Sequence, residues 1–322
     1  MEETKSCLLS YSLDGSGHAE VVDLAAIKPD DERLIWIHLN GRHPDAKKFL
    51  REQLKLDPVV VKTMLAEEMR PRLEEMGGQA LLMLRGINFN PGPTPEDLVS
   101  VRLWIAGNRI VSVGRRKSKT VADLDERIRH GRGPKRVGEF VAMMCSSLND
   151  GIEPSLQELE DTMDRLEAQS LENPDERLRN DIAAIRKQAT LFRRHIAPQR
   201  EVFNRLQFSQ ASWMLGPDKW LMQDNSDRMT RYLEDLEALR DRANILQDEL
   251  QSALSGKLNR NIYILSVITA IFMPLSFFSG LLGMNVKGIP GADHPEAFGI
   301  ACVIALVLAV VQVLVFRRLK WL

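Results

Sequence analysis

The sequence has few cysteines and almost no net charge. Its three cysteines, Cys7, Cys145 and Cys302, lie far apart and form no CxxC pair, which excludes a disulfide framework and a cysteine-rich metal site. The formal net charge is -1, so no long-range positive field attracts nucleic acid, and we expect no nucleic-acid partner. A P-loop, a dinucleotide-binding fingerprint and a pair of nucleophile and base are also missing, so we expect no enzymatic activity. The first residues lack a basic region followed by an apolar stretch, and we expect no signal peptide.

Two stretches near the C-terminus lack charged residues, although such residues make up 27% of the chain. Residues 262–282 form an uncharged run of 21 residues, and residues 298–316 form a run of 19 with one strongly polar side chain, Gln312. At about 1.5 Å per residue, each run can cross a hydrocarbon core of about 30 Å. Basic residues flank the runs: Lys257, Arg260, Arg317, Arg318 and Lys320. By the positive-inside rule we predict a two-helix transmembrane hairpin, with both termini in the cytoplasm and residues 283–297 outside.

Residues 1–135 show both strand-like and helix-like patterns. Apolar and β-branched runs, separated by Gly, Pro and Asn, predict strands. These include Leu34–Leu39, Ala80–Leu84, Val99–Ile105 and Ile110–Val113. Between them, proline in the first turn predicts helices over Pro44–Leu56 and Pro58–Glu68. We therefore predict an α+β cytosolic domain, followed by long helices and the membrane hairpin.

Residues 136–261 show a helical pattern in which apolar residues recur mostly at alternating steps of three and four, as in a coiled-coil seam. The seam positions are Ile152, Leu159, Met163 and Leu166; Leu178, Ile182, Ile185, Ala189, Phe192, Ile196, Gln199, Phe203 and Leu206; and Met229, Tyr232, Leu236, Leu239, Ala243, Leu246, Leu250 and Ala253. Such a seam either joins copies of the chain or buries helices within one chain. Bends are expected at Asn173–Pro174 and at Gln210–Pro217, after which one helix can run from Asp218 to Leu282.

The first apolar run carries more small and polar side chains than the second. On a helical wheel several of these residues form one stripe with the preceding Asn259 and with two apolar residues of the run. The stripe consists of Asn259, Ile262, Ser266, Thr269, Met273, Ser276 and Gly280, and it leads to Gly283. A hairpin of two spans cannot enclose a pore, so a conducting path needs several copies around an axis. We interpret the stripe as pore-lining, and the alternative is close helix packing through small residues.

The tripeptide Gly283-Met284-Asn285 directly follows the first apolar run. A GMN tripeptide at the outer end of the first of two C-terminal spans is the signature of the CorA superfamily of divalent-cation transporters, and the sequence resembles this superfamily over its whole length. The resemblance implies a funnel-shaped homopentamer in the inner membrane, in contact with lipid, with Gly283, Met284 and Asn285 as the ion filter. It implies a transported divalent cation and no resident cofactor.

Within the superfamily, the sequence is most similar to the zinc-transporting branch. The similarity is carried by residues 70–73 (RPRL), 84–88 (LRGIN), 95–104 (PEDLVSVRLW) and 288–291 (GIPG). Gly291 stands where the magnesium branch more often has an acidic residue, whereas Met284 keeps the form usual in the magnesium branch. We therefore expect zinc uptake. The alternatives are a magnesium, cobalt or nickel channel of the same fold and a non-conducting, membrane-anchored metal sensor.

The first apolar run has no Cys, His or carboxylate that could bind zinc directly. Asn285 offers amide oxygens that suit a cation with its water shell, so we expect hydrated zinc to pass. The resemblance also suggests proton coupling, which requires a titratable group, yet only Tyr263 is ionisable between Asn261 and Met284. The candidates are carboxylates of the cytosolic funnel and three residues of the outer loop: Asp293, His294 and Glu296. Passive transport is the alternative.

Overall fold

The computed structural model describes residues 7–23, 32–67, 70–87, 98–284 and 295–318. The described chain forms two compact units, the first within residues 1–173 and 177–247 and the second within residues 174–176 and 248–322. The predicted boundary at 135–136 falls just before helix α4 (Val137–Glu172), and the predicted boundary at 261–262 falls inside helix α6 (Gly216–Leu282). The division into three parts stays a prediction.

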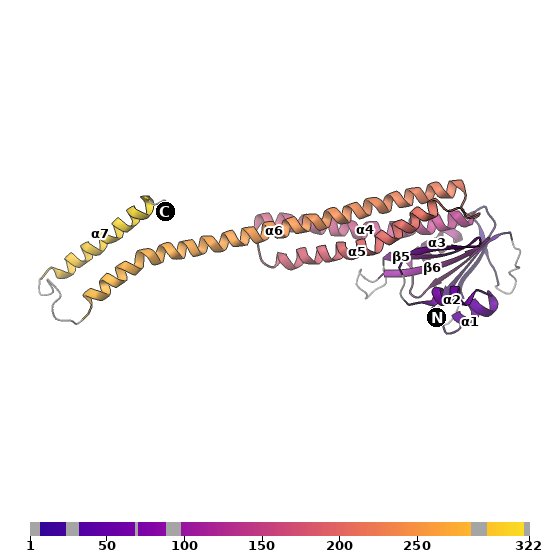
Figure 1. The fold of residues 1–322 in the computed structure, drawn as a ribbon, viewed down its shortest axis with the longest axis horizontal. Helices are drawn as coiled ribbons and strands as arrows, with labels where there is room; N and C mark the ends of the chain where they lie inside the picture. The colour runs from indigo at the N-terminus through magenta and orange to yellow at the C-terminus, as the bar shows by residue number, and fades with distance from the viewer. Residues whose placement is uncertain (1–6, 24–31, 68–69, 88–97, 285–294, 319–322) are drawn as a thin grey trace. The chain divides into compact units, whose positions relative to one another are not determined.

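A seven-stranded sheet forms the centre of the first unit (Figure 1). Its strand order is β2-β1-β3-β7-β6-β5-β4, and all neighbours are antiparallel except β3 and β7, which are parallel. The strands are β1 (Cys7–Leu13), β2 (Ala19–Val21), β3 (Leu34–Asn40), β4 (Arg72–Met76), β5 (Gln79–Ile87), β6 (Leu98–Ala106) and β7 (Arg109–Gly114). The four predicted strands are confirmed within β3, β5, β6 and β7, whereas the sequence patterns did not predict β1, β2 or β4.

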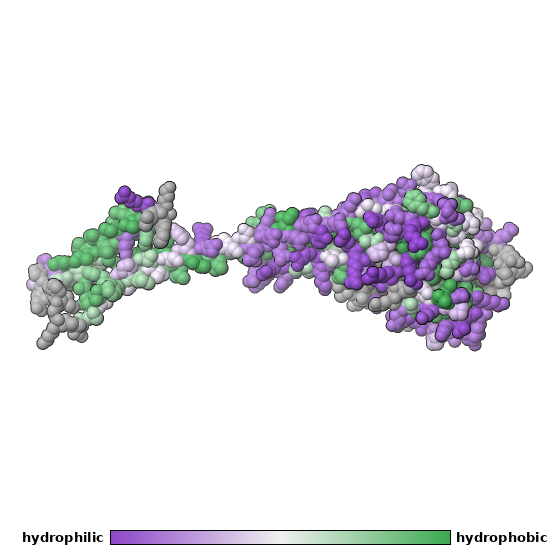
Figure 2. Space-filling view, viewed as in Figure 1, coloured by the Kyte–Doolittle hydropathy of each residue, from purple (hydrophilic) through white to green (hydrophobic). Residues whose placement is uncertain are grey.

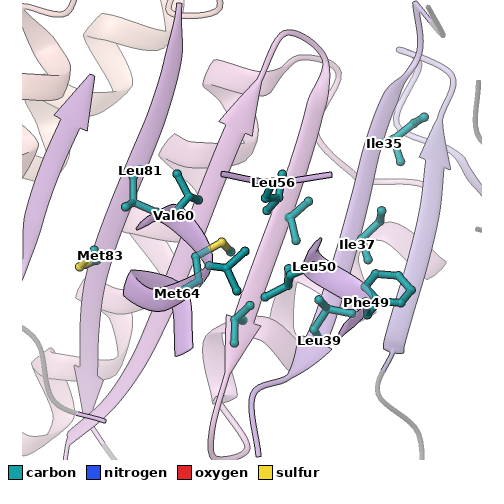
Figure 3. Packing of buried hydrophobic residues seen from close by; sticks show 13 residues of the cluster. Ile35, Ile37, Leu39, Phe49, Leu50, Leu56, Val60, Met64, Leu81 and Met83 are labelled. Carbon is teal, nitrogen blue, oxygen red and sulfur yellow. The ribbon is translucent and has the colours of Figure 1, made fainter. Parts of the chain in front are cut away.

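Apolar side chains on one face of the sheet pack against short helices (Figure 3). These are α1 (Ala46–Lys48), the π-helical turn η3 (Phe49–Gln53) and α2 (Pro58–Leu65). Side chains alternate along a strand, so the residues of β3 that flank Ile37 point to the opposite face. There Trp36 packs edge-on against Phe140 of α4, with ring centroids 5.1 Å apart. The sheet is therefore covered on both faces.

Both helices predicted before β4 are shorter in the structure. The segment Pro44–Leu56 contains only α1 and η3, and Lys55 has a left-handed φ of 53°, which is incompatible with a continuing helix. The predicted helix Pro58–Glu68 ends at Leu65 because Ala66 leaves the helical conformation, with ψ of 148°. Both expectations extended too far because the apolar spacing did not reveal these backbone changes.

Helix α3 (Lys119–Arg129) was not predicted. Its buried residues Val121, Leu124 and Ile128 are spaced by three and four, so the signal was present in the sequence.

Helices α4, α5 (Leu178–Gln207) and the first part of α6 lie side by side in the first unit (Figure 1). The predicted seam positions are buried within the chain except Ala253, which is exposed. Ion pairs join these helices: Arg228 Nη2 lies 2.9 Å from Asp150 Oδ1 of α4, and Arg193 Nη2 lies 2.6 Å from Glu237 Oε1. The buried seam residues therefore pack helices within one chain.

The second unit contains the end of α6 and the helix α7 (Ala297–Arg318). Both helices contain windows apolar and long enough to cross a membrane, and neither window is buried in the structure. Figure 2 shows hydrophobic side chains along both segments. The two apolar runs at 262–282 and 298–316 are therefore confirmed as helical.

Candidate cation pathway

The GMN tripeptide begins at the turn that ends α6. The backbone N–H of Gly283 donates to Ser279 O at 3.0 Å, and that of Met284 donates to Leu281 O at 3.4 Å. A Cβ atom at position 283 would lie 3.3 Å from Ser279 O, closer than most real Cβ contacts. Glycine therefore allows the chain to leave the helix close to its own carbonyl groups. Met284 is half exposed.

Three predicted site residues, Asn285, Asp293 and His294, lie outside the described residues. Glu296 is described, and its carbonyl oxygen accepts from Ile300 N at 3.1 Å, which places it immediately before α7. A carboxylate at this position is favoured by the positive end of the helix dipole.

The predicted stripe lies on α6, and its seven residues are exposed in the single chain. Ser266 Oγ donates to Ile262 O, and Thr269 Oγ1 donates to Leu265 O, both at 2.8 Å. Both hydroxyl hydrogens are thus satisfied by the helix itself, as an apolar environment requires. The oxygen lone pairs are left to accept hydrogen bonds from water around a cation.

Three stripe residues also lie beside α7. Asn259, Ile262 and Ser266 line a groove of about 390 Å³ together with Phe316 of α7. The other four stripe residues do not line this groove. Phe316 was not predicted as a site residue, although its position at the end of the second apolar run, directly before Arg317, was an available signal.

Gln312 is the strongly polar side chain of the second apolar run, and its Oε1 atom is buried without a hydrogen-bond partner in the described chain. An unpaired amide is unfavourable in hydrocarbon. Residues 7–23, 32–67, 70–87, 98–284 and 295–318 contain no group of three His, Cys, Asp or Glu side chains that could hold a metal ion. Direct coordination by such a cluster is therefore not available in this part of the chain.

His38 is a core residue and not a ligand candidate. It is buried, and its Nδ1 lies 2.8 Å from Ser112 Oγ. Burial lowers the pKa of His38 to about 4, so the imidazole is neutral at physiological pH.

An α+β unit, a 67-residue helix that ends in an apolar segment and a second apolar helix define a two-span membrane protein with a helical stalk. Residues 31–318 match the family model of the CorA-like Mg2+ transporter protein. The chain belongs to this family.

Known proteins resemble the chain over nearly its whole length. The divalent cation transporter CmaX of Pseudomonas aeruginosa is 36% identical, over 99% of this chain and 98% of its own length. The zinc transport protein ZntB of Yersinia enterocolitica is 33% identical, over 99% of this chain and 97% of its own length. The predicted similarity to the CorA superfamily and to its zinc branch is therefore confirmed.

Solved structures share the fold. The structure of full-length CmaX has a TM-score of 0.86 at 35% identity and covers 99% of both chains. The CorA magnesium transporter from Methanocaldococcus jannaschii has a TM-score of 0.82 at 22% identity, over 98% of this chain and 99% of its own. The predicted α+β domain with long helices and two apolar spans is therefore confirmed.

Proposed function

We propose that the protein transports divalent metal cations, with zinc as its principal substrate, through a pore formed by several copies of the chain. The observation that carries this proposal is the position of Gly283 and Met284. They form the turn that follows the apolar, membrane-length segment of α6. The predicted stripe runs along this segment and reaches the same turn. A filter at the end of a polar helix face suits a cation that keeps its water shell.

The oligomer follows from the two spans of each chain. Two apolar helices cannot surround a water-filled path, so symmetry-related copies must complete it. We propose a homopentamer in the inner membrane, with both termini in the cytoplasm because basic residues flank the spans at Arg260 and Arg317. The unpaired Oε1 atom of Gln312 supports this assembly, since a second copy can supply the missing donor.

The similarity to the zinc-transporting branch favours zinc over magnesium. The side chains of the stripe and of the turn favour a hydrated ion in either case. ZntB is named a zinc transport protein and CmaX a divalent cation transporter. Neither the stripe nor the turn at Met284 contains a Cys, His or carboxylate side chain, the usual direct zinc ligands. We therefore propose that zinc passes with its water shell and that other divalent cations compete with it.

Proton coupling is part of the proposal for zinc uptake. The described end of the outer loop contains one carboxylate, Glu296, beside the start of α7. Asp293 and His294 precede it in the sequence. A titratable group at the outer mouth can exchange protons with the external solution before the cation enters the filter.

The test is zinc uptake into liposomes that contain the purified full-length protein. Asn285→Ala should abolish uptake because it removes the filter amides, whereas Asn261→Ala, the same change outside the stripe, should retain it. An inward proton gradient should accelerate uptake in the wild type. Uptake of magnesium without zinc would contradict the choice of metal, and the absence of any Asn285-dependent flux would favour the sensor alternative.

A further inference from the structure

The cytosolic part of α6 has one face that is exposed in the described part of the chain. Its exposed positions alternate by four and three residues over the whole of this segment. We define this outer α6 face as Trp220, Asp224, Asp227, Arg231, Glu234, Ala238, Asp241 and Ile245. The opposite side, which includes Met229, Leu236 and Ala243, is buried against α4 and α5.

The spacing of the outer α6 face continues along the helix without a break in step. After Ile245 it passes through Asp248, Ser252 and Ser255 and reaches Asn259, the first residue of the polar stripe. A repeat of 3.5 residues keeps one face in line only when helices supercoil around a common axis. The outer α6 face and the membrane stripe therefore share one repeat in the sequence of α6.

The composition of the outer α6 face argues against a dry helix seam. It carries four carboxylates and a single cationic side chain, Arg231. Apart from Asp241, which accepts from the adjacent Arg240 at 2.9 Å, these charged residues form no ion pair with another described residue. In contrast, arginines beside this face form ion pairs with α4: Arg228 pairs with Asp150, and Arg242 pairs with Asp164.

We propose that the outer α6 face lines a water-filled vestibule on the cytosolic side of the pore and that Arg231 is the residue that limits cation passage there. This proposal rests on the proposed function, because it needs the oligomeric pore. Rings of carboxylates from several copies raise the local concentration of divalent cations. A ring of Arg231 side chains between Asp227 and Glu234 opposes them and forms the one positive barrier on this face.

The first test measures initial zinc flux through the full-length protein in liposomes. Arg231→Gln should increase the rate, and Arg231→Glu should increase it by about threefold or more, since a cleft lined by one sign of charge raises the local counter-ion concentration by about tenfold to a thousandfold. Asp227→Asn should lower the rate. Arg179→Gln, which removes an exposed arginine of α5, should leave it unchanged.

Ionic strength separates a charge barrier from a structural effect. The difference between Arg231→Glu and the wild type should be large at about 0.01 M salt and small at about 1 M, where the screening length falls from about 30 Å to about 3 Å. A difference independent of salt, or a lower flux in Arg231→Gln together with a weaker oligomer, would assign Arg231 to subunit packing and overturn the proposal. Unchanged flux in every Arg231 variant, with Asn285-dependent flux present, would overturn it while leaving the proposed function intact.

The second test does not depend on flux. Ala238→Cys places a thiol on the outer α6 face, and a bifunctional maleimide should join neighbouring copies there. Glu158→Cys, on the exposed surface of α4, should not cross-link, and the unsubstituted chain with its three native cysteines gives the background. No cross-link above this background at Ala238→Cys would show that the face does not surround the axis. Cross-linking without any Asn285-dependent flux would overturn both the proposed function and the role of Arg231.

Discussion

The guanidinium of Arg136 donates from Nη2 to Oδ1 of Asp218 across 3.0 Å, although 82 residues separate them. The Asp218 side chain is completely buried, and its Oδ2 accepts from the backbone N–H of Leu215 at 3.2 Å. This ion pair joins the first turn of α6 to the start of α4. It fixes the end of the stalk helix that is remote from the membrane.

Arg136→Ala should destabilise the protein because it leaves the buried Asp218 carboxylate with only a backbone partner. We expect the free energy of unfolding to fall by about 2 kcal/mol, which is typical of a lost hydrogen bond to a charged group. Thermal unfolding of the detergent-solubilised protein provides the measurement. Arg132→Ala, a change at a nearby exposed arginine, should have almost no effect. Equal effects of the two substitutions would contradict a specific role for the ion pair.

Gly138 gives the Asp218 carboxylate the space that it occupies. An added Cβ would collide with the carboxylate, so Gly138→Ala should destabilise the protein even though alanine is the better helix former. Gly256→Ala is the matched control because, outside the helix's own backbone, no atom of the described residues lies within 4 Å of its added Cβ. This control should be neutral or stabilising by up to about 1 kcal/mol. Melting temperatures that rise for both variants would refute the close contact.

Two arginines of α6 hold this helix against α4 at separate points. Arg228 pairs with Asp150 and Glu153, and Arg242 pairs with Asp164 and Glu167. Each substitution to Ala should lower the free energy of unfolding by about 1 kcal/mol. The value is small because the carboxylates are largely accessible to water. The two sites share no partner, so the double variant should show the sum to within about 0.5 kcal/mol. Chemical denaturation of the two single variants and the double variant measures these free energies of unfolding. Strong non-additivity would indicate that the two ion-pair sites act as one unit.

Acid should weaken the fold through His38. Burial lowers its pKa to about 4 in the folded protein, whereas the unfolded chain binds a proton near pH 6.5. The contribution of neutral His38 to the free energy of unfolding is therefore fully present above about pH 6.5. It is lost as the pH falls toward 4, and the loss amounts to at most about 3 kcal/mol. His38→Gln can keep the hydrogen bond to Ser112 but cannot titrate. Unfolding measured from pH 7 to pH 4 should show a shallower loss in this variant than in the wild type.

The strands that the sequence predicted share a strong apolar pattern, whereas two of the missed strands, β2 and β4, do not. β3 reads LIWIHLN and is buried along almost its whole length. β4 reads RLEEM, stands at an edge of the sheet and is largely accessible, while β2 has three residues at the other edge. Edge strands bury few side chains, so their sequences show little of the hydrophobic pattern on which prediction depends.

Arg102 shows why a local pattern cannot explain every buried position. It lies inside the correctly predicted strand β6, yet its side chain is completely buried. Its Nη2 donates to Ala66 O at 2.5 Å, and the neighbouring Arg115 Nη1 donates to Leu65 O at 3.1 Å. These arginines satisfy carbonyl groups at the C-terminal end of α2, which have no partner within the helix. The partner segment lies more than 30 residues away, so its position is a result of the fold.

The sequence by itself determined the two apolar helices, the long α6 and the position of the GMN tripeptide after it. These features depend on the length and period of hydrophobic runs, which are local properties of the chain. Only the tertiary structure decided that the seam packs within one chain, that Asp218 meets Arg136 and that Arg231 lies on an open face. Each depends on which distant segment covers a given side of a helix. The free energy of that choice comes from apolar area buried between elements, which no single segment encodes.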